Sequence, residues 1–213
     1  MSYYLAIDIG ASSGRHILGS IEDGKIKLEE IYRFENGISK IGDEYCWDIQ
    51  GLFNEIKKGI KKCKEIGKVP KTIGIDTWAV DFVLLDENDE MLGNAVAYRD
   101  DRTEGYMEKA FQVIPQDMLY LYTGIQFQRF NTLYQLLAIK DKNPEYLKKA
   151  KTFLMIPDYL NFLLTGKKAN EYTNATSTQL VNSFDRTWDK NILKEYGINE
   201  EMFQEIKMPK TSL

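Results

Sequence analysis

Hydrophobic and polar positions recur along the chain first with the period of strands and later mainly with that of helices. Tyr3–Ile9 is an apolar run in which Asp8 is the only charged residue. A short stretch of small residues follows, and residues 17–21 are again largely apolar. Residues 25–34 alternate polar and apolar positions, which is typical of a half-exposed strand. Because Asp23-Gly24 is a two-residue hairpin signal, we predict three antiparallel strands in a row.

A helix and further strands are expected next. Residues 44–47 form a possible short strand, and Asp48 is a good N-cap for a helix that runs to Lys64 with its apolar residues on one face. Gly67 is expected to end this helix. Residues 72–76 predict a buried strand, and residues 80–86 contain a second apolar strand after a polar break.

The second half of the chain is predicted to be mainly helical. Its one clear strand is at 153–156, and the threonine-rich segment 171–179 is either a loop or a partly buried polar segment. Gly124 and Gly166 are expected to end helices, and aromatic residues such as Tyr120 and Tyr134 are most simply explained as core. The predicted helices cover residues 104–113, 115–122, 131–141, 144–149, 158–165, 189–196 and 200–206.

Composition narrows the class of protein. The chain has 213 residues, of which 43% are hydrophobic, and this fits one large domain or one and a half. The net charge of −4 argues against a nucleic-acid binder. Two cysteines and one histidine without metal-ligand spacing argue against zinc. With no apolar run of the roughly 20 residues that span a bilayer and no signal peptide, we expect a cytoplasmic protein.

The turn after the first strand combines groups that suit a phosphate. Asp8 stands at the end of the strand. The loop beside it offers backbone N–H groups, the hydroxyls of Ser12 and Ser13, and the Arg15 guanidinium. Donors of this kind bind phosphate oxygens, and a carboxylate can hold the water shell of Mg²⁺. The residues alone leave two interpretations open, a phosphate-binding hairpin or an ordinary hairpin with a surface aspartate.

Two common phosphate motifs do not fit this turn. A dinucleotide fingerprint has G-x-G-x-x-G opening a helix, whereas Gly10 and Gly14 precede a second apolar run that predicts a strand. A P-loop has Gly-Lys-Ser/Thr, and the chain's one Gly-Lys pair, at 166–167, is followed by lysine. A second predicted strand also ends in a carboxylate, Asp76. Two such strand ends favour a functional site, because sites are commonly built on loops at strand ends.

The order of these elements, with Asp8 at the first turn, resembles the ribonuclease H-like fold of the actin/hexokinase superfamily, an α/β class with a mixed sheet, antiparallel hairpins and flanking helices. Within it the chain resembles the FGGY carbohydrate kinases. The first matching segment is shared widely in the superfamily, whereas the others together are specific. The matching segments are residues 8–15, 74–78, 80–86, 97–100, 130–136 and 171–176.

The resemblance implies ATP-dependent phosphorylation of a sugar with Mg²⁺, and within the family it is strongest to members that act on the 1-hydroxyl of L-rhamnulose. Asp8 would orient the metal through water. The family usually has glycine where this chain has Ala79, which affects the expected sugar preference. The residues implied to bind ATP phosphates are Ala11, Ser12, Ser13, Gly14 and Arg15. The residues implied to bind the sugar are Asp76, Trp78, Ala79, Tyr98, Arg99, Asp100 and Asn131.

The resemblance places no catalytic base in this chain. In the family that base is an aspartate of a second, C-terminal domain, which also holds the adenosine pocket. The ending Met208–Leu213 is typical of a connection between domains. The resemblance therefore implies that residues 1–213 are an N-terminal sugar-binding domain, with an interdomain linker that starts at about 207. We expect this domain to turn over negligibly alone. The alternatives are a kinase for another ketose or polyol, and a non-catalytic, one-domain relic that binds a sugar or a partner.

Overall fold

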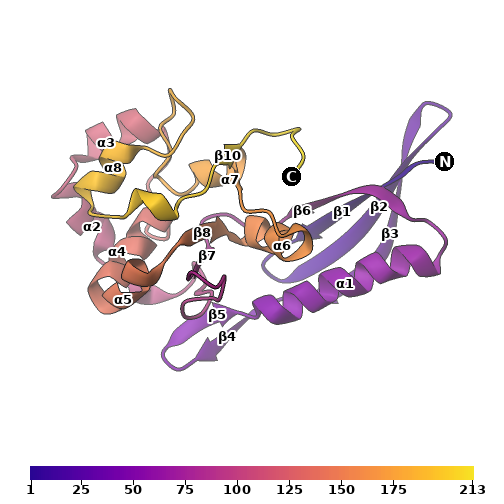
Figure 1. Cartoon of the computed structure of the whole chain (residues 1–213), viewed down its shortest axis with the longest axis horizontal. Coiled ribbons are helices and arrows are strands. Elements are labelled where there is room, and N and C mark those ends of the chain that lie inside the picture. The colour runs from indigo at the N-terminus through magenta and orange to yellow at the C-terminus, as the bar shows by residue number, and fades with distance from the viewer. The chain divides into compact units, whose positions relative to one another are not determined.

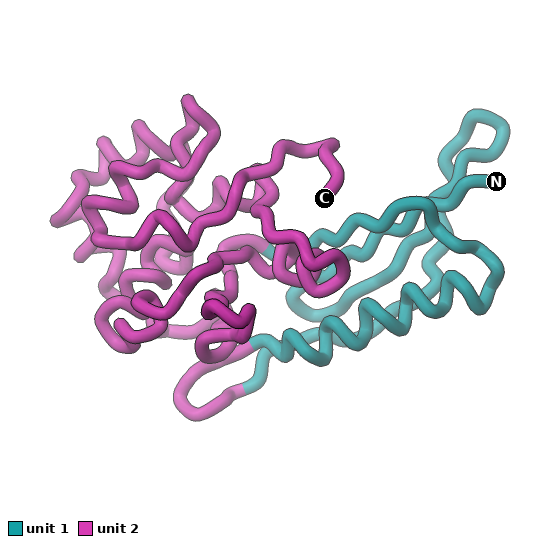
Figure 2. The backbone as a smooth tube through the Cα atoms, in the orientation of Figure 1, with its two compact units in different colours: residues 1–39, 47–78 teal, residues 40–46, 79–213 magenta.

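The computed structural model describes residues 1–213, which divide into two compact units (Figure 2). Unit 1 comprises residues 1–39 and 47–78, and unit 2 comprises residues 40–46 and 79–213. Figure 1 labels the helices and strands in chain order. The small sheet formed by β4 (Ile38–Ile41) and β5 (Glu44–Trp47) lies at the boundary of these sequence ranges.

Unit 1 is a four-stranded mixed sheet with one long helix. The strand order is β3-β2-β1-β6. The first three strands are antiparallel, as predicted, and β6 pairs parallel to β1. The helix is α1, which runs beside the sheet in Figure 1. The bounds are β1 Tyr3–Ile9, β2 Ser13–Glu22, β3 Lys25–Glu35, α1 Ile49–Glu65 and β6 Pro70–Asp76.

Turn and cap residues set the ends of these elements as the sequence predicts. Asp23 and Gly24 both have positive φ, 50° and 73°, which is the requirement of a type I′ hairpin turn. Asp48 caps α1, because its Oδ1 accepts a hydrogen bond from the Gly51 N–H at 2.8 Å. Gly67, with φ 71°, turns the chain out of the helix.

The core of unit 1 lies between the sheet and α1. On β1 the apolar positions Leu5, Ile7 and Ile9 are buried, and the residues between them lie on the other, more open face. On α1 the buried side chains include Leu52 and Ile56. The regular alternation on β1 puts Asp8 on the open face of the sheet, away from this core.

The prediction that residues 72–76 are buried is wrong. β6 is a strand, but its side chains are exposed except for the half-buried Pro70 and Ile75. β6 is the outermost strand of the sheet, at the edge opposite β3. It therefore has a neighbouring strand on one side only, and an apolar run alone does not distinguish this position from a central one.

Unit 2 is mainly helical around a short antiparallel pair of strands. β7 (Phe82–Leu85) pairs with β8 (Thr152–Met155), and all the residues of both strands are buried. Around them lie helices whose buried side chains include Leu133, Tyr134 and Leu136. The helices are α2 Tyr106–Phe111, α3 Gln116–Thr123, α4 Thr132–Lys142, α5 Pro144–Lys149, α6 Ile156–Thr165, α7 Tyr172–Thr176 and α8 Lys190–Glu195. Two 3₁₀ turns, η1 (Asp101–Thr103) and η2 (Glu200–Met202), and the short parallel pair β9 (Asn170–Glu171) and β10 (Ile206–Lys207) complete the unit.

Most helices of unit 2 lie where the sequence predicts them, with two differences. The expected helix at 200–206 is only the turn η2, because Phe203 leaves the helical conformation and packs on Phe153 at 4.8 Å between ring centroids. The polar segment 171–179 contains the short helix α7. Gly124 and Gly166 end α3 and α6 with positive φ, as predicted.

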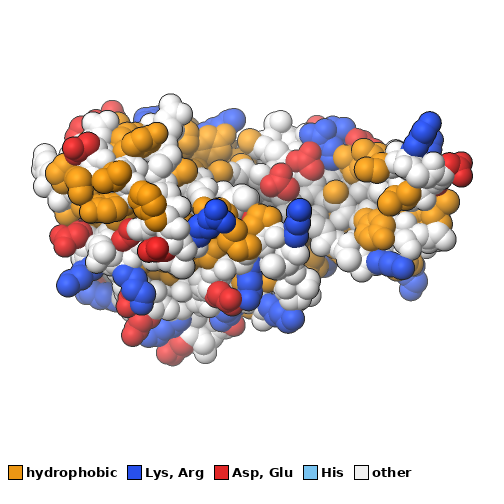
Figure 3. All heavy atoms as spheres, turned by 90° about the horizontal axis from the view of Figure 1, so that it is seen from above, with side chains coloured by type: hydrophobic (Ala, Val, Ile, Leu, Met, Phe, Trp, Pro, Cys, Tyr) orange, Lys and Arg blue, Asp and Glu red, His pale blue; other side chains and the backbone are white.

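The surface carries scattered apolar side chains on both units (Figure 3). Tyr120, predicted to be core, is 53% exposed on α3, whereas Tyr134 is fully buried. Ile21, Ile26 and Leu28 are exposed near the β2–β3 hairpin of unit 1. None of the helices is both long and apolar enough to span a bilayer.

Candidate functional site

The turn between β1 and β2 is a hairpin, as the sequence predicts, and it is hydrogen-bonded to Asn36, the residue that follows β3. The Gly10 N–H donates to the Ser13 carbonyl at 2.9 Å. Asn36 holds the turn twice, because its N–H donates to the Ser12 carbonyl at 3.0 Å and its Nδ2 to the Gly10 carbonyl at 2.8 Å. These bonds use carbonyl groups and leave the N–H groups of Ala11 and Ser12 available to an anion.

Asp8 is flanked by two of the other residues that the sequence singles out. In the antiparallel pair it faces Arg15, and the Arg15 Nε lies 3.2 Å from the Asp8 Oδ2 as an ion pair. In the parallel pair its register partner is Asp76. The side chains of Asp8 and Arg15 remain 48% and 37% exposed. Unit 1 thus brings two carboxylates and a guanidinium together at the end of the sheet where the turn lies.

Gly14 has a structural reason to be glycine. It is buried on β2, and a Cβ at this position would lie 2.1 Å from the Cζ of Phe34 on the neighbouring strand. The Phe34 ring therefore packs directly over the Gly14 backbone. This contact lets β2 and β3 stay paired just behind the turn, where Ser13 faces Glu35 in the register.

The donor set of unit 1 fits a magnesium ion that keeps much of its water shell. The structure contains no group of three or more His, Cys, Asp or Glu side chains that could enclose a metal. Mg²⁺ seldom needs such a cage, since it commonly binds one or two carboxylates together with water and substrate phosphates. Asp8 beside Asp76 supplies two carboxylates of this kind.

Trp78, a predicted sugar contact, follows β6 and stacks on a second tryptophan. Its ring centroid lies 3.9 Å from that of Trp47, with 33° between the ring planes. Trp47 is buried and Trp78 is half-buried. The stack supports one face of the Trp78 ring and fixes the ring's direction in unit 1.

In unit 2, Ala79, Val80 and Asp81 form a tight three-residue turn. The Asp81 N–H donates to the Ala79 carbonyl at 2.9 Å, and Val80 at the centre of the turn has φ 68°. This is a γ-turn of the rarer, strained kind. Ala79 is exposed, whereas Val80 and Asp81 are buried.

Gln135 of α4 is the centre of a buried hydrogen-bond network below this turn. Its Nε2 donates to the Phe130 carbonyl at 2.8 Å and lies within bonding distance of the Asp81 Oδ1 at 3.1 Å and of the Val80 carbonyl at 3.2 Å. Its Oε1 accepts a hydrogen bond from the Arg102 Nη2 at 2.5 Å. Desolvation lowers the pKa of Arg102, and the nearby carboxylate of Asp81 opposes this effect most strongly, so the half-buried cation is compensated by charge.

Tyr98, Arg99 and Asp100 follow one another but differ in their availability to a ligand. The Tyr98 N–H donates to the Asp81 Oδ2 at 3.0 Å, which joins this segment to the turn. Arg99 is exposed and donates from Nε to the Tyr98 Oη at 3.1 Å. Asp100 is buried, and its two oxygens accept from the N–H groups of Tyr45 and Arg102, both at 2.8 Å. Tyr98 and Arg99 are therefore better placed than Asp100 to meet a sugar.

Asn131 is buried and already uses both amide hydrogens. Its Nδ2 donates to the Gln126 carbonyl at 3.0 Å and to the Gln179 Oε1 at 2.9 Å. Its contribution in this structure is to connect the start of α4 with the segment after α7. Only its amide oxygen remains for a ligand.

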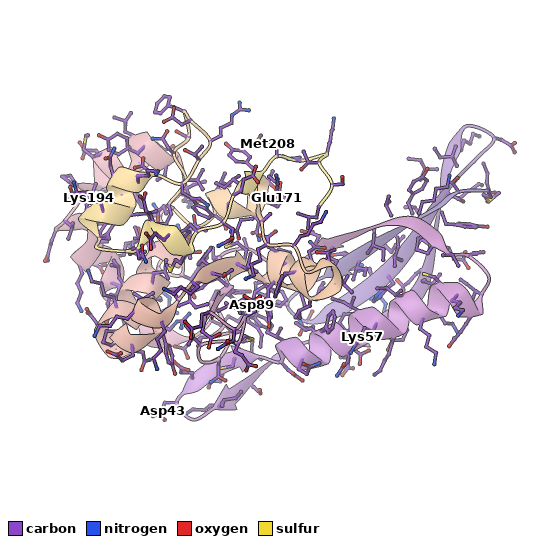
Figure 4. All side chains as sticks on the ribbon, viewed as in Figure 1. Asp43, Lys57, Asp89, Glu171, Lys194 and Met208 are labelled. Atoms are coloured by element: carbon purple, nitrogen blue, oxygen red, sulfur yellow. The ribbon has the colours of Figure 1, made fainter.

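A buried carboxyl group supports the same region. Glu171, labelled in Figure 4, caps α7, because its Oε2 accepts from the Asn174 N–H at 2.9 Å. The Glu171 N–H in turn donates to the Oδ1 of the buried Asp158 at 3.1 Å. Burial raises the pKa of Asp158 to about 8, so this carboxyl group is largely protonated at neutral pH.

The structure thus separates the predicted site residues into two sets, one in each unit. Asp8, residues 11–15, Asp76 and Trp78 belong to unit 1, and the remaining predicted sugar contacts belong to unit 2. The sequence analysis did not identify the residues that hold the turn at Val80. Thr132, Gln135 and Ser177 bond to its backbone, and they lie far from it in sequence. No local pattern marks them, because their partner is a main-chain group.

Comparison with known proteins identifies the family. The chain matches the FGGY family of carbohydrate kinases, N-terminal domain, over residues 3–211. It is 61% identical over 213 residues to the rhamnulokinase of Halalkalibacterium halodurans, covering 100% of this chain and 45% of that protein. It is 57% identical over 207 residues to the rhamnulokinase of Oceanobacillus iheyensis, covering 97% of this chain and 44% of that protein. The chain therefore spans less than half the length of these relatives.

Solved structures confirm the predicted fold. A ligand-bound xylulose kinase from Lactobacillus acidophilus superposes with a TM-score of 0.88 at 22% identity, over 99% of this chain and 43% of that one. A gluconate kinase from the same organism superposes with a TM-score of 0.87 at 22% identity, over 99% of this chain and 42% of that one. With the family match over nearly all residues, the chain belongs to the FGGY family of carbohydrate kinases.

Proposed function

We propose that this chain is the sugar-binding N-terminal domain of a kinase that transfers the γ-phosphoryl group of ATP to O1 of L-rhamnulose. The observation that carries the proposal is 61% identity over all 213 residues to a protein named rhamnulokinase. The fold alone does not select the sugar, because xylulose and gluconate kinases share it at 22% identity. The substrate assignment therefore depends on the sequence likeness.

In this proposal the β1–β2 turn binds ATP phosphates. The uncommitted N–H groups of Ala11 and Ser12 donate to phosphate oxygens, and the hydroxyl of Ser13 is available beside them. Gly14 contributes through the tight packing behind the turn, since the Phe34 ring leaves no room for a side chain. Arg15, already paired with Asp8, adds positive charge where phosphate charge would accumulate.

Asp8 would hold a hydrated Mg²⁺ bound to the phosphates, with Asp76 as its neighbour in the sheet. When bound, the ion neutralises phosphate charge during transfer. Asp8 suits this role because it lies on the open face of the sheet at the turn and keeps nearly half of its side chain exposed. Arg15 would hold the carboxylate in place from the other side.

The sugar would contact an aromatic surface and groups that hydrogen-bond to its hydroxyls. The Trp78 ring, stacked on Trp47, offers an apolar face that suits the methyl group of a 6-deoxy sugar. Ala79 presents its exposed side, and Tyr98 with Arg99 offers a hydroxyl and a guanidinium. Asp76, Asp100 and Asn131 complete the proposed set.

We infer that the base which takes the proton from the sugar O1 comes from a further domain of the complete polypeptide. Of the two carboxylates in the proposed sugar set, Asp100 is buried and accepts hydrogen bonds from the N–H groups of Tyr45 and Arg102, and Asp76 is the register partner of the proposed metal residue Asp8. The relatives are more than twice as long as the match. Residues 1–213 alone are therefore expected to show no L-rhamnulose-dependent ATP consumption.

The experiment is to incubate the complete polypeptide with ATP, Mg²⁺ and L-rhamnulose and to identify the product by ³¹P and ¹³C NMR. The expected product is L-rhamnulose 1-phosphate, formed with one ADP per sugar. If a different ketose or a polyol is phosphorylated in preference to L-rhamnulose, the enzyme with Ala79 has a different sugar specificity from the one proposed. No phosphorylation of any sugar by the complete polypeptide would refute the kinase assignment.

A further inference from the structure

Val80 adopts a conformation that its side chain opposes. Its φ of 68° lies in the left-handed region, which a β-branched residue very rarely occupies. The i to i+2 hydrogen bond from the Asp81 N–H to the Ala79 carbonyl, at 2.9 Å, makes it the centre of a strained γ-turn. Strain of this kind persists only where surrounding groups hold the backbone, and it occurs preferentially at functional sites.

Three side chains from elsewhere in unit 2 hold this turn, and we call them the Val80 clamp. Ser177 accepts a hydrogen bond at Oγ from the Val80 N–H at 3.2 Å. Thr132 donates from Oγ1 to the Val80 carbonyl at 2.6 Å, and Gln135 Nε2 lies 3.2 Å from the same oxygen. Both backbone polar groups of the strained residue are therefore bonded to side chains that lie 52 to 97 positions away in sequence.

The clamp is itself anchored in regular structure. Thr132 and Gln135 belong to the first turn of α4, and both are buried. The Ser177 hydroxyl also donates to the Asn174 carbonyl of α7 at 2.6 Å. The bonds that hold Val80 thus come from the first turn of α4 and from Ser177, the residue that caps the C-terminal end of α7. A movement of the turn at Val80 would break them.

The clamp holds two neighbouring residues in different environments, one buried and one exposed. Val80 is buried, with 5% of its surface exposed, whereas the preceding Ala79 is exposed. With both Val80 backbone groups bonded to the clamp and the Ala79 carbonyl bonded in the γ-turn, the backbone of Ala79 is restrained on its C-terminal side. Loss of a clamp bond would let the strained turn relax, and Ala79 would then sample other orientations.

We propose that Ser177, Thr132 and Gln135 are positioning residues for sugar binding, which hold Val80 in its strained turn so that Ala79 is presented to the ketose in one orientation. This inference rests on the proposed function, since it takes residue 79 as part of the sugar site. It extends that function by assigning a role to residues that do not themselves touch the sugar. Binding geometry held by preorganised supporting groups is a general route to specificity.

The test measures kcat and both KM values in the complete polypeptide for Ser177→Ala and Thr132→Val. Each substitution removes one clamp bond without changing the exposed residue. We expect KM for the preferred ketose to rise about tenfold, the equivalent of one hydrogen bond, with KM for ATP within about twofold of wild type. Thr132→Ser keeps the hydroxyl and should restore KM for the ketose.

Matched controls remove a hydroxyl that does not contact Val80. Thr123→Val deletes a buried hydroxyl that donates to the Leu119 carbonyl of its own helix at 2.8 Å. Thr176→Val deletes a more exposed hydroxyl, which donates to the Thr173 carbonyl within α7 at 2.8 Å. Both controls should leave KM for the ketose unchanged. If the clamp variants behave like these controls, the clamp does not position the sugar.

The strain itself provides a second measurement that does not depend on activity. Val80→Gly should be more stable to urea than Val80→Ala, the reverse of the usual order, because glycine adopts positive φ freely. Val80→Gly should also reduce the effect of Ser177→Ala on KM. A wild-type polypeptide that phosphorylates no sugar would overturn the proposed function and this inference together. An active wild type with unaffected clamp variants would overturn this inference alone.

Discussion

Replacing Gly59 with alanine tests how α1 packs on the sheet that carries the phosphate turn. Gly59 is buried on the sheet-facing side of the helix. A Cβ at this position would lie 2.2 Å from both the Cδ2 and the Nε2 of His16, which is fully buried on β2. Normal carbon–carbon contacts are about 3.5–4.0 Å. The His16 ring therefore occupies the space that any other residue would need at position 59.

The expected magnitude follows from two opposing effects. Alanine in place of glycine inside a helix normally stabilises by about 0.5–1 kcal/mol. Forcing an extra methyl group into a packed core costs about 1–3 kcal/mol, and the approach to His16 is close enough to favour the upper part of that range. Gly59→Ala should therefore lower the free energy of unfolding by about 2 kcal/mol. For a chain of this size that corresponds to a fall in Tm of about 4–8 °C.

Circular dichroism melts and urea titrations of Gly59→Ala, His16→Ala and the double variant measure this coupling. In the His16→Ala background the ring is gone, so Gly59→Ala should become stabilising by about 1 kcal/mol through helix propensity alone. The sign of the substitution's effect is thus expected to reverse. A stabilising effect of Gly59→Ala in the wild-type background would refute the packing of α1 on β2 described above.

Three further predictions concern charge. Burial raises the pKa of Asp158 to about 8, so the folded state keeps a proton that the unfolded state loses above about pH 4, and the stability of the fold falls as pH rises from 4 towards 8. In urea unfolding, Asp158→Asn should therefore stabilise the protein by up to roughly 4 kcal/mol at pH 7 and hardly at all at pH 4. Burial lowers the pKa of His16, against smaller opposing effects of Ile56 and Glu55, so the unfolded state takes up a proton first and the wild type loses stability as pH falls below about 6.5. His16→Gln should not show this loss of stability, and equal pH profiles of stability for the variant and the wild type would contradict the prediction. Asp8→Asn in the complete polypeptide should lower kcat by about 100-fold with KM for the sugar little changed, and an unchanged kcat would exclude the metal role.

The sequence predicts the local structure of unit 1 well because its signals are local. Asp23-Gly24 requires positive φ at both residues of the hairpin turn, and both have it. Asp48 caps α1 with its own carboxylate, and Gly67 ends that helix. In each case the residue that gives the sequence signal itself forms the turn, the cap or the helix end. β4 has no comparable signal and was not predicted.

The failures occur where distant contacts decide the structure. Phe203 packs on Phe153 and on Trp188, and the Trp188 Nε1 donates to the Gln204 carbonyl at 2.7 Å, so the predicted helix at 200–206 is replaced by a short turn. β6 has the composition of a buried strand but lies at the sheet edge. Strand pairing and aromatic packing over long sequence separations are not visible in a local pattern.

The candidate site was predictable in part for the same reason. Asp8 and Asp76 were identified from strand ends and Arg15 from the loop after the first strand, and the sheet places them side by side. Valine at position 80 gives no indication of a left-handed backbone, because its propensity opposes one. The groups that stabilise this conformation, such as Ser177, are remote in sequence and bond only to the main chain.

The most direct test of the central claim is a competition experiment with the complete polypeptide. L-Rhamnulose and D-xylulose are supplied together with ATP and Mg²⁺, and the ratio of the two phosphorylated products gives the ratio of kcat/KM. We expect a preference for L-rhamnulose of about 100-fold, the size of discrimination that a few shape and hydrogen-bond contacts supply. An equal or reversed preference would contradict the assignment of this chain as the sugar-binding domain of an L-rhamnulose kinase.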